Sequence, residues 1–210
     1  MIRVLLIDDH TMFRQGLRRL IDHESDMEVV GEAPNGVEGL EYLRKLDVDV
    51  LLLDISLPGK NGLEVLKEVK EESPSPHVIM LSMHPEERFG VRAMKAGADG
   101  YMTKESAADE LVEAIRKVTR GRKYIPQKLA EALADGTRRE DGLPQHETLS
   151  AREFTVMLLI GAGKTPTEIA AELNLSPPTV STYRKRILTK MGMATTVEIM
   201  KYVMENRLTG

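Results

Sequence analysis

The fold is decided by residues 50–59, whose sequence is VLLLDISLPG. It begins with a short apolar run, which is typical of a strand buried on both faces of a parallel sheet. The run ends in an acid, Asp54, and a Pro-Gly turn signal follows. Two similar runs occur at Val4–Ile7 and Val78–Leu81. The three runs predict the central strands of one sheet.

Helical patterns separate these runs up to about Arg120. Leu63, Leu66 and Val69, for example, recur at helical spacing. Weaker strand patterns at 27–33 and 100–103 bring the predicted strands to five. Strands that alternate with helices predict an α/β fold, a doubly wound five-stranded parallel sheet. We expect the strand order 2-1-3-4-5 and a site at the carboxyl ends of the strands.

Three acids mark that edge of the predicted sheet. Asp8 and Asp9 follow the first strand, and Asp54 ends the third. These two strands are neighbours in the expected order, so three carboxylates would meet in one cleft. Their mutual repulsion is tolerable if a divalent cation joins them, and ligation by oxygen alone suits Mg²⁺. A carboxylate beside Mg²⁺ can attack a phosphoryl group.

Ser82 and Lys104 follow the fourth and fifth strands, where a hydroxyl and an ammonium would reach phosphoryl oxygens. A single acid at a strand end more often caps a turn, but five such groups at four strand ends favour a site. His10 and His84 lie nearby, and for both we prefer a solvated or hydrogen-bonded histidine over a metal ligand.

Composition narrows the class of protein. The chain has no Cys, which excludes disulfides, thiolate metal sites and a Cys nucleophile. Its apolar runs are too short for a signal peptide or a membrane span, so we expect a soluble cytoplasmic protein with no membrane partner. The net charge is -4, yet residues 147–210 contain eight Lys or Arg and six Asp or Glu. This asymmetry favours a nucleic-acid partner for the C-terminal part.

The chain changes character after residue 120. Residues 121–146 are expected to be a linker with a short helix at 127–134. From residue 147 we predict a small all-α domain with two capping boxes, Ser150 to Glu153 and Thr165 to Glu168. A turn at Asn174 would join two helices.

The second of these helices has two distinct sides. Val180, Ile187 and Met191 form one apolar stripe, and the opposite side carries small, polar and basic residues: Ser181, Thr182, Lys185, Arg186 and Thr189. Such a helix can enter the major groove of DNA, although an ordinary amphipathic helix is the alternative. We place Arg184 at an inward or boundary position, paired with Glu153, so that Arg184→Ala would lower stability more than sequence preference.

Residues 1–120 resemble a receiver domain of the flavodoxin-like CheY superfamily. The resemblance is carried by Asp8-Asp9, Asp54 with the Leu-Pro-Gly after Ser56, Ser82, and the sequence from Tyr101 to Lys104. It implies that Asp54 takes a phosphoryl group from a sensor histidine kinase. It further implies that Asp8, Asp9, Asp54 and the carbonyl of Ser56 hold Mg²⁺, that Lys104 contacts the phosphate, and that Ser82 and Tyr101 form a switch pair.

Residues 147–210 resemble the LuxR-type helix-turn-helix, through Leu149 to Glu153, Glu168 to Ala170, and Thr179 to Ser181. A receiver joined to this module is typical of the NarL/FixJ response regulators. The resemblance implies a homodimer that binds double-stranded DNA when phosphorylated. It implies base contacts from Ser181, Thr182 and Lys185, and phosphate contacts from Thr179 and Arg186. Many relatives have Lys and His at the positions of Ser181 and Tyr183.

Other functions are possible from the residues alone. A phosphohydrolase of the haloacid-dehalogenase type would need an acid two residues after Asp54, where this chain has Ser56. A DNA binder that never uses phosphate would not need the acidic site. The last predicted helix, about 196–206, is a dimer contact or part of the domain core, and the two interpretations are nearly equal.

Overall fold

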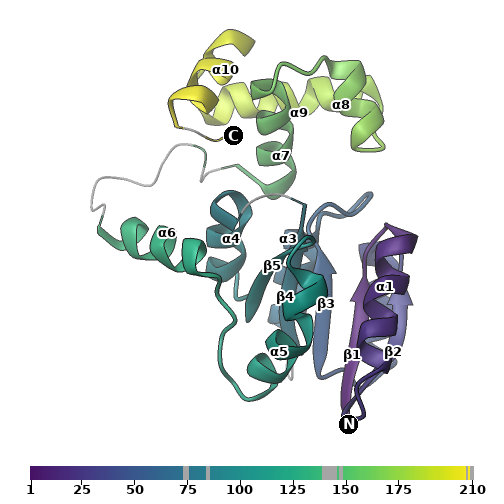
Figure 1. Cartoon of the computed structure of the whole chain (residues 1–210). Helices are drawn as coiled ribbons and strands as arrows, with labels where there is room; N and C mark the ends of the chain where they lie inside the picture. The colour runs from purple at the N-terminus through teal and green to yellow at the C-terminus, as the bar shows by residue number, and fades with distance from the viewer. Residues whose placement is uncertain (73–75, 84–85, 139–145, 147–148, 207, 209–210) are drawn as a thin grey trace. The chain divides into compact units, whose positions relative to one another are not determined.

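The computed structural model describes residues 1–72, 76–83, 86–138, 146, 149–206 and 208. The chain divides into two compact units, Met1–Arg139 and Glu140–Gly210. Figure 1 shows the helices and strands of both. Among the described residues, no helix is both long and apolar enough to span a bilayer.

The described part of the first unit contains one parallel sheet. Its strands are β1 (Ile2–Ile7), β2 (Met27–Ala33), β3 (Val50–Asp54), β4 (His77–Ser82) and β5 (Gly100–Thr103). Their order is β2-β1-β3-β4-β5, which confirms the predicted sheet and its order. All residues of β3 are buried, as the continuous apolar run requires.

Helices cover both faces of this sheet: α1 (Thr11–Asp22), α2 (Gly36–Leu43), α3 (Gly62–Glu71), α4 (Glu86–Lys95) and α5 (Ala107–Thr119) (Figure 1). Helices α1 and α5 contact each other, and so do α2 and α3. The core under α1 and α5 takes alternate residues of each strand, such as Val4 and Leu6, because successive side chains point to opposite faces. This arrangement leaves the strand ends free to present polar groups.

The segment predicted as a linker contains a helix that belongs to the first unit. Helix α6 (Gln127–Arg138) is longer than the expected 127–134 and contacts α4. Leu129 of α6 is fully buried, and a Cβ atom at Gly90 of α4 would lie 2.7 Å from it. Before α6, Tyr124 extends the sheet edge, since its carbonyl accepts a hydrogen bond of 3.1 Å from the Tyr101 N–H. Residues 139–145 lie outside those described.

The second unit contains α7 (Ala151–Gly161), α8 (Pro166–Glu172), α9 (Pro177–Lys190) and α10 (Thr196–Glu205). Both predicted capping boxes are present, at Ser150 and Thr165. Asn174 adopts φ 50°, the left-handed conformation that Asn tolerates better than most residues, so it turns the chain between α8 and α9 as predicted.

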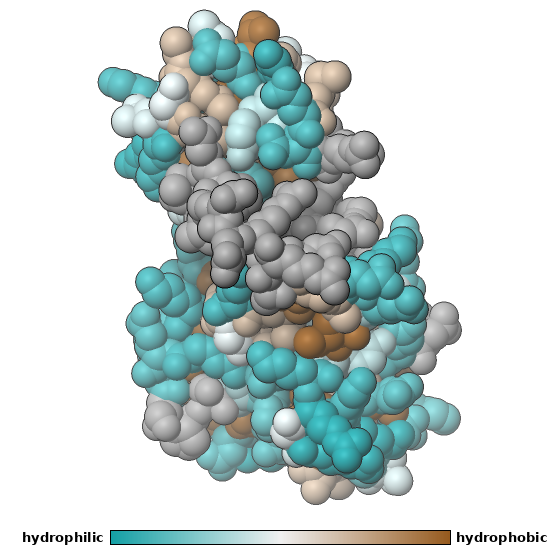
Figure 2. Space-filling model, turned by 90° about the vertical axis from the view of Figure 1, so that its left-hand side faces the viewer, coloured by the Kyte–Doolittle hydropathy of each residue, from teal (hydrophilic) through white to brown (hydrophobic). Residues whose placement is uncertain are grey.

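Polar and apolar side chains alternate on the surface that Figure 2 presents. Figure 2 shows mostly hydrophilic residues on the face it presents, with smaller apolar areas between them. In α10, Ile199 and Val203 are buried in the core of the second unit, whereas Val197 and Met204 are each 70% exposed. Helix α10 therefore packs in the core on one side and exposes apolar side chains on another.

Candidate functional site

The carboxyl ends of β1 and β3 bring two acids together. Ile7 is aligned with Leu53 in the sheet, so Asp8 and Asp54 follow at adjacent positions. Both side chains are 1% exposed, and Asp9 is 27% exposed. The Ser56 N–H donates a hydrogen bond of 3.0 Å to Asp54 Oδ1, and the His10 N–H donates one of 2.8 Å to Asp8 Oδ1. The backbone after each strand thus orients the two carboxylates.

Lys104 lies between these carboxylates. Its Nζ is 2.8 Å from Asp54 Oδ2 and 2.7 Å from Asp8 Oδ2, and its side chain is 5% exposed. The Lys104 N–H donates to the carbonyl of Ser82, which joins the ends of β5 and β4. The ammonium also lies 4.9 Å from the centre of the Phe13 ring. One buried cation therefore faces two buried acids.

The pKa of the Asp54 carboxyl is raised, first by burial and then by the neighbouring acid. Burial raises the pKa of the Asp54 carboxyl above its usual value, and the Asp8 carboxylate raises it further. Lys104 acts in the opposite direction but does not cancel the increase. A second cation near Asp54 would offset the remaining repulsion.

The donor set fits a metal ion. Asp8, Asp9, His10 and Asp54 each offer a ligand atom, and these atoms lie within 4.8 Å of one another. Asp8 Oδ2 and Asp9 Oδ1 are buried, and each has an ion-pair partner: Lys104 Nζ lies 2.7 Å from Asp8 Oδ2, and His10 Nδ1 lies 2.7 Å from Asp9 Oδ1. Carboxylate oxygens with unused lone pairs are suitable ligands for a divalent cation.

The second unit presents a helix with the predicted two sides. Val180, Ile187 and Met191 are at most 2% exposed, which confirms the apolar stripe. The other side of α9 is exposed at Ser181, Thr182, Lys185, Arg186 and Thr189. Helix α8 packs against α9. A helix-turn-helix with an exposed basic side is therefore present in the second unit.

Comparisons with known proteins identify both units. A model of the response regulator receiver domain matches residues 4–116, and a model of bacterial regulatory proteins of the luxR family matches residues 147–203. The chain belongs to the two-component response regulators with a LuxR-type DNA-binding domain. Members of this family are transcription regulators and not enzymes, which argues against the phosphohydrolase alternative.

Individual relatives span nearly the whole response regulator. UvrY of Escherichia coli K12 is 39% identical over 200 residues, which cover 95% of this chain and 92% of UvrY. The nitrate/nitrite regulator NarL of the same strain is 36% identical over 207 residues, covering 98% and 96%. A solved structure of RcsB from Salmonella typhimurium has a TM-score of 0.63 at 27% identity, covering 97% and 99%. Other solved RcsB structures include a DNA complex and two dimers bound to two parallel DNAs.

The structure also places three other residues singled out from the sequence: Ser82, Tyr101 and Arg184. Ser82 and Tyr101 are fully buried, in β4 and β5. Arg184 was expected to point toward the core and pair with Glu153, and that prediction was wrong: Arg184 is exposed, and its guanidinium lies 3.5 Å from the Thr196 hydroxyl. A long Arg side chain can start at a core-facing angle and still carry its charge to solvent.

Lys190 is the actual partner of Glu153. Its Nζ lies 2.6 Å from Glu153 Oε2, which also accepts a hydrogen bond of 2.8 Å from the Ser150 N–H. Burial alone would raise the pKa of Glu153, but Lys190 and Ser150 together hold it below its usual value. The ion pair therefore ties the last turn of α9 to the first turn of α7.

Glu153→Gln is expected to lower the free energy of unfolding of the second unit by about 1 kcal/mol at neutral pH, because Gln keeps the cap but not the charge. The depressed pKa means that this stabilisation exists above the unfolded-state pKa of about 4.3 and is lost as the pH falls further. Urea unfolding and amide hydrogen exchange of α7 and α9 measure the stability of the wild type and the variant. The difference between the two proteins should disappear at acidic pH. Glu205→Gln, in an exposed pair with Lys201, is the control. A difference that stays constant with pH would refute this role.

Sequence reasoning missed several residues around the acidic site. His10 was expected to be solvated or hydrogen-bonded, and its 58% exposed side chain, with Nδ1 2.7 Å from Asp9 Oδ1, agrees; its place among the possible metal ligands was not foreseen. Gly62 was not singled out, although a Cβ atom there would lie 2.1 Å from the Asp54 carbonyl oxygen. The sequence could have pointed to Gly62, because this residue directly follows Asn61, the N-cap residue of α3. His84 lies outside the described residues.

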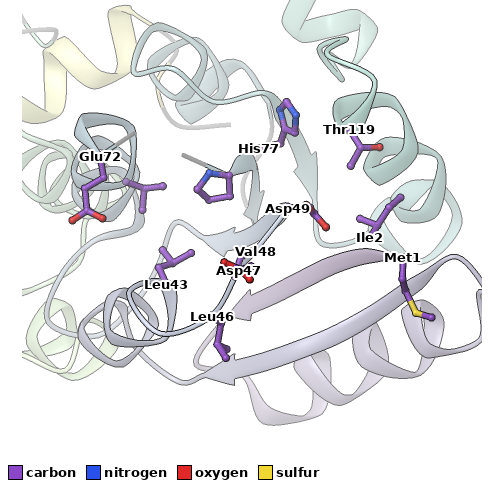
Figure 3. Close-up of a pocket in the computed structure, with 12 residues that line it drawn as sticks. Met1, Ile2, Leu43, Leu46, Asp47, Val48, Asp49, Glu72, His77 and Thr119 are labelled. Carbon is purple, nitrogen blue, oxygen red and sulfur yellow. The ribbon is translucent and has the colours of Figure 1, made fainter. Parts of the chain in front are cut away.

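A cavity of about 640 Å³ lies at the end of the sheet opposite to the acidic site. Figure 3 shows its lining from the beginning of β1, from the segment before β3 and from the beginning of β4, including Ile2, Asp49 and His77. Because the strands are parallel, their amino ends all lie at this end of the sheet. The cavity is therefore separate from the acidic site of the response regulator.

Proposed function

We propose that Asp54 accepts a phosphoryl group from a sensor histidine kinase and that this phosphate controls DNA binding by the second unit. The observation that carries the proposal is the pair of buried acids, Asp8 and Asp54, with Lys104 Nζ within 2.8 Å of both. A cation held at a carboxylate can stabilise the charge of an incoming phosphoryl group. The cytoplasmic location stays a prediction.

In this proposal Asp8, Asp9, Asp54 and the Ser56 carbonyl hold Mg²⁺. When bound, the ion neutralises charge on the phosphoryl oxygens. An Asp54 carboxylate oxygen forms the new bond to phosphorus, and the donor histidine nitrogen keeps the electrons of the bond that breaks. Lys104, already against Asp54, moves its hydrogen bonds to the phosphoryl oxygens.

Phosphate on Asp54 would then change the packing of Ser82 and Tyr101. Both are fully buried, Ser82 at the end of β4 and Tyr101 within β5, and the Tyr101 N–H donates a hydrogen bond to the carbonyl of Tyr124, just before α6. We infer that a shift of this pair alters α4, β5 and the segment packed on them. In the proposed organisation, residues 1–120 are the receiver, 121–146 connect, and 147–210 bind DNA.

The proposed output is a homodimer on double-stranded DNA. The RcsB dimers bound to DNA support this by similarity. Two recognition helices would lie about one DNA turn apart. Ser181, Thr182 and Lys185 would contact base edges, and Thr179 and Arg186 would contact phosphates; all five are at least partly exposed.

Two variants of α9 test the DNA contacts. Lys185→Ala should weaken binding to a duplex selected by the wild type from a random-sequence pool by about 1–3 kcal/mol and relax the sequence preference. Arg186→Ala should weaken binding to all duplexes. It should also reduce the slope of the logarithm of the binding constant against the logarithm of the salt concentration by about one. Fluorescence anisotropy at several salt concentrations measures both. Lys45→Ala, an exposed lysine of the first unit, is the control. Wild-type affinity and preference in both α9 variants would exclude this interface.

A further inference from the structure

The imidazole of His10 lies over the acidic site. Its backbone is held by the hydrogen bond to Asp8 Oδ1, and it precedes the first turn of α1. The side chain is 58% exposed, so it faces solvent on one side and the carboxylates on the other. Nδ1 lies 2.7 Å from Asp9 Oδ1, 3.3 Å from Asp8 Oδ1 and 3.9 Å from Asp54 Oδ2.

These distances are similar to those between atoms that bind the same metal ion. Around an octahedral ion with bonds of about 2.1 Å, adjacent ligand atoms lie about 3.0 Å apart and opposite ones about 4.2 Å. The separations from Nδ1 to Asp8 Oδ1 and Asp54 Oδ2, 3.3 and 3.9 Å, fall within that interval, and the separation to Asp9 Oδ1, 2.7 Å, is about 0.3 Å shorter than its lower end. Lys104 Nζ lies 3.3 Å from His10 Nδ1, so the ammonium lies between the imidazole and the carboxylates of Asp8 and Asp54.

We propose that His10 Nδ1 is an additional metal ligand, so that the site can take a first-row transition cation such as Mn²⁺ in place of Mg²⁺, through one nitrogen and several oxygens. The inference rests on the proposed metal site at Asp54. Imidazole is a good ligand for transition metals, whereas Mg²⁺ prefers oxygen. His10 thus makes the site discriminate in favour of transition cations, in competition with Mg²⁺.

Pulsed electron paramagnetic resonance of Mn²⁺ bound to the full chain detects a coordinated nitrogen directly. We expect ¹⁴N modulation in the wild type and in His23→Ala, a control at the other end of α1, and none in His10→Ala. His10→Ala should also lose about tenfold in Mn²⁺ affinity, with Mg²⁺ affinity changed much less. Because the His10 side chain is mostly exposed, the variant should unfold at the wild-type temperature.

The outcomes separate this inference from the proposed metal site. Mn²⁺ that binds the wild type without ¹⁴N modulation, in a manner lost in Asp54→Asn, would overturn the role of His10 and leave the oxygen site intact. Modulation that persists in His10→Ala would also overturn it. Mn²⁺ affinity unaffected by both His10→Ala and Asp54→Asn would contradict the metal site itself.

Discussion

Asp54→Asn is expected to abolish phosphoryl uptake from acetyl phosphate and Mg²⁺. The amide is nearly the same size as the carboxylate, so the site keeps its shape but loses the nucleophilic oxygen. Intact-mass spectrometry should show one phosphoryl group per wild-type chain and none on the variant. Sedimentation should show a shift toward dimer in the phosphorylated wild type alone.

Asp47→Asn is the matched control, because the Asp47 side chain is fully exposed and lies at the cavity on the other edge of the sheet. It should take up phosphate as the wild type does. Phosphoryl gain by Asp54→Asn equal to that of the wild type would place the acceptor elsewhere.

Gly62→Ala is expected to destabilise the first unit by about 3 kcal/mol. The added Cβ would lie 2.1 Å from the Asp54 carbonyl oxygen and 2.9 Å from Ile55 Cα. Both are backbone atoms, so neither can move aside without moving the Asp54 segment. Urea unfolding measures the loss, and phosphoryl uptake under native conditions should fall with it.

Gly16→Ala tests the same substitution where there is space. No atom lies within 4 Å of a Cβ at Gly16, in the middle of α1. The free energy of unfolding of this variant should exceed that of the wild type by about 0.5–1 kcal/mol, because Ala loses less backbone entropy than Gly when a helix forms. Equal stability of Gly62→Ala and the wild type would contradict the close approach at α3.

The sheet and the backbone positions at the site could be predicted because they depend on strong local patterns. Short, continuous apolar runs such as 50–53 are typical of buried strands, and the acids that follow such strands lie at the same end of a parallel sheet. The stripe of Val180, Ile187 and Met191 was equally predictable, since helical spacing fixes which residues share a side. The capping boxes follow from sequence spacing alone.

Side-chain partners were harder to predict, because they depend on how elements pack. Arg184 and Lys190 are both on α9, and only the packing of α9 against α7 decides that Lys190 reaches Glu153. His10 follows Asp9 in the chain, but the direction of its ring depends on how α1 begins. The contact of α6 with α4 through Leu129 depends on the absence of a side chain at Gly90.

Control of DNA binding by phosphate on Asp54 is tested most directly by the affinity of the full chain for the selected duplex with and without acetyl phosphate. We expect the phosphodonor to tighten wild-type binding by about tenfold or more and to leave the affinity of Asp54→Asn unchanged. Wild-type protein that gains the phosphoryl group and binds the duplex with unchanged affinity would contradict it.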